Sequence, residues 1–314
     1  MCKIIYYHGL PGRFPELSSV NQAFTLAHFR RQIRWLSNRY ELITVDEVLN
    51  RSGAKNGLTN TVCITTDDGL ADNAIFAEIV AGYGGRMTLF LNTAVLDNRD
   101  LMWRHKVNYV ASMTDAARQK TLIGNLTDPS RSVGSRSRSR LPQSGQPTLR
   151  QPTLQDWSQH WPMRQKDSLA DALWNRAGLA PVGEFLAWQQ PYLSWQQVRS
   201  LVADGHAVGT HTVSHPDCSR LDWDDLRDEV VESARTIREH TGRPVQALTW
   251  PFGRRPKPEL ERRLRHENPT IRLLMGIAPM FGFVSLEERE DMEHPFLTAL
   301  FNLYAQPLRR LILS

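Results

Sequence analysis

Short apolar runs that alternate with helical patterns are the feature that most constrains how this chain can fold. Seven runs are long enough for strands, and apolar residues with helical spacing lie between them. The runs are Lys3–Tyr7, Glu41–Val45, Thr61–Thr65, Arg86–Leu91, Ala207–His211, Val245–Trp250 and Ile271–Gly276. Because strands and helices alternate, the sequence predicts repeated βα units and a parallel sheet.

Two amphipathic helices can be placed by spacing alone. Phe29, Ile33 and Leu36 recur at helical intervals and predict one buried face. A second helix is predicted with Asp222 as its N-cap and the sequence Gly-Arg-Pro at 242–244 as its stop. Its apolar face would comprise Leu226, Val230, Ala234 and Ile237.

The segment 98–192 interrupts the strand pattern. Residues 131–140 read RSVGSRSRSR and are followed by two copies of QPTL, which cannot bury enough apolar surface to offset their ordering entropy. We therefore predict a flexible tip at about 131–155, within an insertion that packs on the main domain. The arginines could bind phosphates, but no aromatic interleaving or nucleic-acid motif accompanies them, so no nucleic acid partner is predicted.

The length supports one elaborated domain over residues 1–314. Removing the insertion from the 314 residues leaves about 220, the usual size of one βα barrel. We predict an α/β fold, a distorted (β/α) barrel of about seven parallel strands with a long, partly disordered insertion. The insertion holds most of the nine tryptophans.

Composition excludes several other classes of protein. A hydrophobic fraction of 41% and a net charge of +5 are those of an ordinary globular chain. Three widely spaced cysteines argue against a disulfide scaffold and a cysteine-based zinc site. The first residues are too polar for a secretory signal, and no apolar run is long enough for a transmembrane segment, so we expect a cytoplasmic protein.

Two polar motifs directly follow apolar runs. The first motif, TTDDG, contains Asp67 and Asp68. A capped turn is the alternative interpretation of this pair of carboxylates. His211 and His215 lie four residues apart in the second, HTVSH, and can face one way on a helical turn. Two imidazoles and one carboxylate form a metal-binding set that leaves positions open, although unrelated surface histidines could show the same spacing. Both motifs lie where α/β folds build their sites, at the carboxyl ends of strands.

A third run leads into Trp250, Pro251, Phe252 and Gly253. In order, TTDDG, HTVSH and TWPFG resemble the signatures of the polysaccharide deacetylases with nodulation-deacetylase homology, carbohydrate esterase family 4. The resemblance covers about 1–96 and 193–255 and is weak elsewhere.

The resemblance implies a role for each motif residue. Asp67 would be the general base that takes a proton from metal-bound water. Asp68, His211 and His215 would hold a divalent ion, most commonly Zn²⁺, and the backbone N–H of Phe252 would stabilise the oxyanion. The implied substrate is an N-acetylated carbohydrate, and the implied reaction is hydrolysis of its N-acetyl group.

The sequence departs from the family pattern at two points. Thr249 replaces the motif arginine that often orients the base in this family. The late histidine that acts as general acid has no clear match, so His294, His105 and His8 remain candidates for that role. A surface-loop histidine is the alternative interpretation of His294.

Substrate contacts are the least constrained part of the sequence. Trp103, Trp195, Pro251 and His8 are candidates, although core packing of the insertion is the favoured interpretation of the tryptophans. Cys218 follows the second motif, and we interpret it as a loop thiol because the three-residue metal set is complete without it.

Two alternative functions remain open. The same metal site could hydrolyse another non-peptide C–N amide, such as a formyl-sugar or a small cyclic amide. The scaffold could also be a catalytically silent carbohydrate-binding protein, although the intact pair of Asp67 and Asp68 argues against this.

Overall fold

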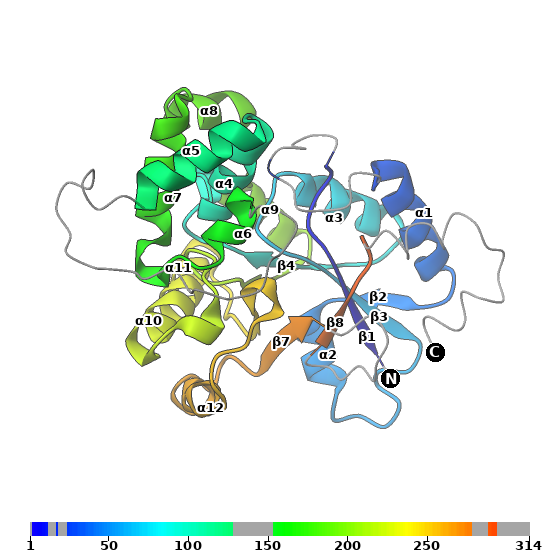
Figure 1. Cartoon of the computed structure of the whole chain (residues 1–314). Coiled ribbons are helices and arrows are strands. Elements are labelled where there is room, and N and C mark those ends of the chain that lie inside the picture. Colours follow the sequence, from blue (N-terminus) through cyan, green and yellow to red (C-terminus); the bar gives the residue numbers. More distant parts are fainter. Residues whose placement is uncertain (1, 12–16, 18–23, 128–152, 278–287, 294–314) are drawn as a thin grey trace, which may run out of the picture.

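A computed structural model of the chain describes residues 2–11, 17, 24–127, 153–277 and 288–293 (Figure 1). Its central feature is a parallel sheet of eight strands. The strands are β1 (Lys3–Tyr7), β2 (Glu41–Ile43), β3 (Thr61–Thr66), β4 (Thr88–Leu91), β5 (Ala207–Thr210), β6 (Ala247–Thr249), β7 (Leu273–Ile277) and β8 (Glu288–Asp291). The predicted α/β fold is confirmed.

The sheet curls until its ends meet. β1 pairs with β8 on one side and with β3 on the other, so seven strands form a ring in the order β1-β8-β7-β6-β5-β4-β3. β2 lies outside the ring and pairs with the first half of β3, whose second half pairs with β4. Seven apolar runs predicted seven strands, but β8 corresponds to none of these runs and was not predicted.

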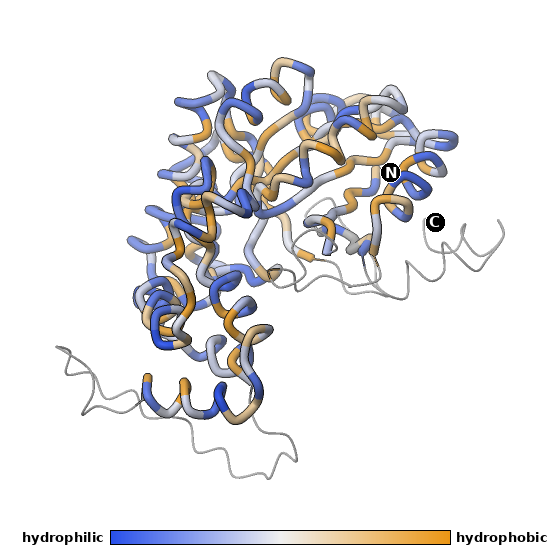
Figure 2. Tube along the Cα trace, turned by 90° about the horizontal axis from the view of Figure 1, so that it is seen from above, coloured by the Kyte–Doolittle hydropathy of each residue, from blue (hydrophilic) through white to orange (hydrophobic). Residues whose placement is uncertain are grey.

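The strands are apolar on both faces because one face lines the ring and the other meets helices. Alternate residues of most ring strands share one cluster inside the ring, which includes Ile4, Cys63, Phe90, Ala247 and Met275. Their neighbours Ile5, Ile64 and Leu89 join a second cluster with the surrounding helices. In the hydropathy view, apolar segments gather toward the middle of the molecule (Figure 2).

Further helices pack against the ring. They are α1 (Leu26–Ser37), α2 (Val45–Arg51), α3 (Asp72–Gly82), α9 (Trp195–Ala203), α10 (Trp223–Arg227), α11 (Ser233–Thr241) and α12 (Pro258–Glu267). In α1 the predicted face of Phe29, Ile33 and Leu36 is buried. None of the helices in the described ranges is long and apolar enough to cross a membrane.

The second predicted helix is confirmed with one irregularity. The Asp222 side chain accepts a hydrogen bond from the backbone N–H of Asp225 and caps α10, and Gly242 ends α11 with a φ of 69°. A π-helical turn, Asp228–Glu232, joins α10 to α11.

The inserted segment builds a helical layer with its own core. Its helices are α4 (Trp103–Ser112), α5 (Ala116–Thr127), α6 (Leu154–Ser158), α7 (Lys166–Ala177) and α8 (Val182–Gln189), which lie together beside the ring (Figure 1). Trp103, Trp161 and Trp174 are buried in one cluster there, so these three tryptophans are packing residues. Most of the predicted flexible tip, 131–152, lies outside the described residues, while Thr153 caps α6.

Candidate functional site

The loops after β3 and β5 bring one carboxylate and two imidazoles together. Asp68 Oδ1 lies 3.5 Å from His211 Nε2 and 3.4 Å from His215 Nε2. All three residues are buried, and their potential ligand atoms lie within 4.8 Å of one another. They meet because parallel strands of a ring all end at the same rim.

Unusual backbone geometry produces this convergence. Asp68, Thr212 and His215 have φ angles of 69°, 72° and 57°, in the left-handed region that non-glycine residues rarely adopt. Such conformations cost about 1–3 kcal/mol each and cluster at functional sites. The expectation of a helical turn for His211 and His215 was wrong, since these residues form a loop. The backbone N–H of His215 donates to Thr212 Oγ1 at 3.1 Å and stabilises that loop.

The three side chains fit a divalent cation. Asp68 Oδ1 is buried and has no hydrogen-bond partner among the described residues. His211 Nδ1 lies 2.9 Å from the Thr249 carbonyl oxygen, which can only accept a hydrogen bond. With the proton on Nδ1, the Nε2 lone pair is available to a metal. Tetrahedral ligands at about 2.0–2.1 Å from an ion lie about 3.3 Å apart, close to the separations seen here.

Burial also favours the ligand form of His215. It lowers the pKa of His215 to about 3, so that the imidazole is neutral near pH 7. A neutral imidazole keeps the lone pair that a metal needs.

Asp67 forms an ion pair with Arg289, a residue that the sequence did not identify. Arg289 of β8 places Nη1 2.7 Å from Asp67 Oδ1 and Nη2 2.7 Å from Oδ2. Although burial alone would raise it, the charge of Arg289 holds the pKa of Asp67 well below its usual range. Asp67 is therefore ionised. No apolar run marks β8, so no sequence signal identified Arg289.

The match to known proteins includes the histidine motif. The sequence model described as polysaccharide deacetylase matches residues 163–266, which contain HTVSH and TWPFG. Within residues 163–266 the chain is similar to the polysaccharide deacetylase family. A stretch of 57 residues is 42% identical to a chitooligosaccharide deacetylase of Bradyrhizobium sp. (strain ANU 289), over 18% of this chain and 24% of that protein. The chain thus matches about a quarter of the length of this curated relative.

Solved structures of deacetylases share the fold at low sequence identity. The deacetylase PplD of Streptococcus pyogenes, solved with acetate, gives a TM-score of 0.52 at 14% identity, over 92% of this chain and 90% of that chain. A de-N-acetylase from Aggregatibacter actinomycetemcomitans gives 0.52 at 12% identity, over 95% and 98%. The deacetylase domain of BpsB from Bordetella bronchiseptica gives 0.51 at 14% identity, over 92% and 94%.

His8 lies at the same rim as Asp67. The backbone N–H of Asp67 donates to the Tyr7 carbonyl oxygen at 3.0 Å, which places the end of β1 beside Asp67. The His8 ring Nδ1 lies 3.1 Å from Glu293 Oε2, and the His8 backbone N–H donates to Glu293 Oε1. Burial would lower the pKa of His8, but the hydrogen bond and charge of Glu293 raise it to about 10. His8 is therefore protonated near pH 7.

Phe252 and Trp103 flank the histidine loop. The Phe252 ring meets the His215 ring edge-on, with centroids 4.6 Å apart, and its backbone has a φ of 58° beside the buried Pro251. Trp103 Nε1 donates to the His215 carbonyl oxygen at 2.8 Å, so Trp103 braces the loop from the inserted layer. Because only 2% of Trp103 is exposed, its indole offers little surface for stacking on a sugar.

The remaining candidates lie in different surroundings. Trp195 is not brought to the cluster, because its ring is buried and stacks on His240 at 4.1 Å. His105 is buried, with Nδ1 2.6 Å from the Tyr192 hydroxyl, and burial lowers its pKa to about 4. His294 lies outside the described residues. Cys218 is a free, buried thiol.

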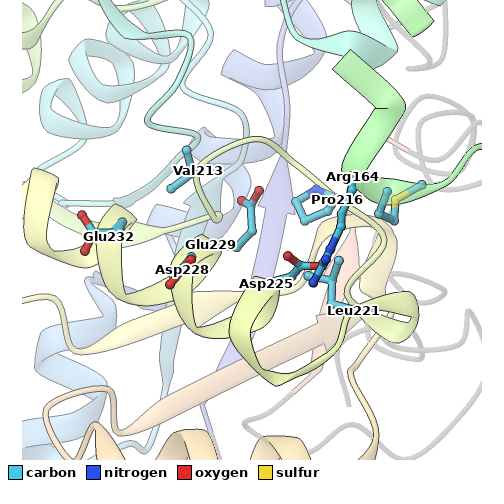
Figure 3. Close-up of a pocket in the computed structure, with 9 residues that line it drawn as sticks. Arg164, Val213, Pro216, Leu221, Asp225, Asp228, Glu229 and Glu232 are labelled. Atoms are coloured by element: carbon cyan, nitrogen blue, oxygen red, sulfur yellow. The ribbon is translucent and has the colours of Figure 1, made fainter. Parts of the chain in front are cut away.

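An acidic pocket lies on the α10 side of the histidine loop (Figure 3). Its volume is about 280 Å³, and none of Asp67, Asp68, His211 and His215 lines it. Its lining residues are Met163, Arg164, Val213, Pro216, Leu221, Asp225, Asp228, Glu229 and Glu232. Glu229 turns toward the loop and accepts a hydrogen bond from the Ser214 backbone N–H at 2.8 Å. The pocket wall thus supports the segment between the two histidines.

Proposed function

We propose that this protein is a metal-dependent hydrolase that removes N-acetyl groups from an amino sugar in a glycan. The observation that carries the proposal is the meeting of Asp68 with His211 and His215 beside an ionised Asp67, in a chain that matches the polysaccharide deacetylase model over residues 163–266.

The metal would be held by Asp68 Oδ1 and the Nε2 atoms of His211 and His215. A divalent ion, Zn²⁺ in the first instance, would supply Lewis acidity toward the amide carbonyl and toward water. Asp67, ionised and held by Arg289, would accept the proton of the attacking water.

The departing amine needs a proton, and His8 is the candidate best placed to give one. His8 directly follows Tyr7, whose carbonyl oxygen accepts a hydrogen bond from the Asp67 backbone N–H. Glu293 keeps the His8 imidazole protonated. The backbone N–H of Phe252 would donate to the oxyanion that forms on the carbonyl oxygen. Two residues of the chain would thus handle protons, and a third would stabilise negative charge.

Acetate release from a panel of N-acetylated oligosaccharides, measured with and without a chelator, tests the proposal. We expect release that the chelator abolishes and added Zn²⁺ restores. Asp67→Asn should keep its metal and lose at least a hundredfold in kcat, since general-base catalysis contributes about 10²–10⁴-fold.

Other outcomes of the same assay separate the alternatives. Formate in place of acetate would favour a formyl-sugar substrate. A metal-loaded wild-type protein that binds the glycans but releases no product would support a silent carbohydrate-binding protein. Normal turnover by Asp67→Asn would show that Asp67 is not the base.

A further inference from the structure

Arg289 is a fully buried cation inside the ring of strands. None of its surface is exposed, and its guanidinium carbon lies 4.7 Å from the centre of the Tyr6 ring and 5.5 Å from that of Phe90. A buried charge is costly unless it is paired and hydrogen-bonded. The described part of the chain places one carboxylate in ion-pair contact with Arg289, that of Asp67.

The pairing fixes the orientation of the Asp67 carboxylate. Each Nη atom of Arg289 donates to a different carboxylate oxygen, at 2.7 Å in both cases. A two-pronged contact of this kind sets the plane of the carboxylate, which a single contact would leave free to rotate. Each oxygen keeps a further lone pair, so Asp67 can still accept a hydrogen bond from water.

Strand β8 delivers this arginine to the site. It closes the ring by pairing with β7 on one side, where Ile277 faces Arg289, and with β1 on the other. Thr249 of β6 places its Oγ1 3.5 Å from Asp67 Oδ1, the oxygen that Arg289 Nη1 also contacts. Two strands therefore face one carboxylate, and the residue on β6 carries no charge.

We propose that Arg289 is the positioning residue of Asp67 and that it supplies from β8 the guanidinium that the family motif would place at residue 249. The inference rests on the proposed function, in which Asp67 is the base. It assigns a role in the site to β8, which lies outside the matched region 163–266.

Kinetics of four variants of the full chain test the role of Arg289. Arg289→Gln removes the cation, and Arg289→Lys keeps a charge without the two-pronged contact. Arg289→Ala removes the side chain, and Arg289→Ala with Thr249→Arg moves the guanidinium to β6. Arg272→Gln, which changes an exposed arginine just before β7, is the matched control. For each protein, kcat and KM for acetate release are measured together with bound metal and thermal unfolding.

The effect should fall on kcat. We expect Arg289→Gln and Arg289→Lys to lose at least tenfold in kcat, with KM within threefold of wild type and the metal retained. The relocated arginine should recover at least tenfold over Arg289→Ala alone, which a merely structural role would not produce. Arg272→Gln should match the wild type.

Contrary results separate this inference from the proposed function. If the wild type releases acetate and Arg289→Gln or Arg289→Lys keeps kcat within twofold of it, Arg289 does not position the base. A loss confined to KM or to metal content would also overturn the inference. If Arg289→Gln does not fold, Arg289→Lys decides. A wild type without hydrolytic activity would instead refute the proposed function.

Discussion

At the scale of single residues, the metal set makes the most direct prediction. Asp68→Asn replaces the buried carboxylate beside His211 and His215 with a neutral amide, which is a far weaker ligand. We expect at least a tenfold lower metal content after dialysis, measured by elemental analysis. Asp204→Asn, at an exposed position after α9, should retain its metal. Equal metal content in the two variants would place the ion elsewhere.

The pair of His8 and Glu293 predicts a pH dependence. Protonated His8 is the proposed acid, so activity should fall as pH rises through the pKa of His8, which Glu293 raises to about 10. Glu293→Gln removes the charge of Glu293, the largest contribution that opposes burial, while Asp67 and Asp68 still raise the pKa of His8, so this pKa falls part of the way. The alkaline limb of the kcat profile should therefore move to lower pH by at least about one unit. An unmoved limb, as expected for the exposed control Glu184→Gln, would exclude His8 as the acid.

At the scale of elements, helix ends are set by local sequence. Ser194 caps α9 in a reciprocal capping box, in which its side chain accepts from the Gln197 backbone N–H while Gln197 accepts from the Ser194 backbone. Ser194→Ala should lower the free energy of unfolding by about 1 kcal/mol. Urea denaturation would measure the change. Ser200→Ala, on the exposed side of the same helix, should change it by no more than about 0.5 kcal/mol.

The same locality explains which elements could be predicted. Asp222 caps the beginning of α10 and Gly242 caps the end of α11, and each lies next to its helix in the sequence. Strand β8 has no comparable local signal. Its inward arginine is stable only because Asp67, more than two hundred residues away in sequence, accepts both of its Nη donors.

At the scale of the whole molecule, closure of the ring depends on tight packing inside it. A Cβ added at Gly209 on β5 would lie 2.2 Å from Phe90 Cε1 on β4 and 3.0 Å from the Ala247 carbonyl oxygen on β6. Gly209→Ala should therefore lower the free energy of unfolding by about 1–3 kcal/mol.

A second substitution checks that the cost comes from this contact. Phe90→Leu should cost less in the Gly209→Ala protein than in the wild type, a coupling that a double-mutant cycle measures. Gly183→Ala on α8, where an added Cβ meets nothing within 4 Å, should not destabilise. Additive effects of Gly209→Ala and Phe90→Leu would show that the strands shift to accept the methyl group.

The sequence by itself determined the parallel α/β architecture, the helices α1, α10 and α11, and the motifs at the strand ends. These depend on periodicity and caps, which are local properties. Only the tertiary structure decided that β1 and β3 close the ring, that Arg289 holds Asp67, and that Glu293 holds His8. Those contacts join residues far apart in sequence. Their charges are tolerated in the interior only once the fold has brought opposite partners together.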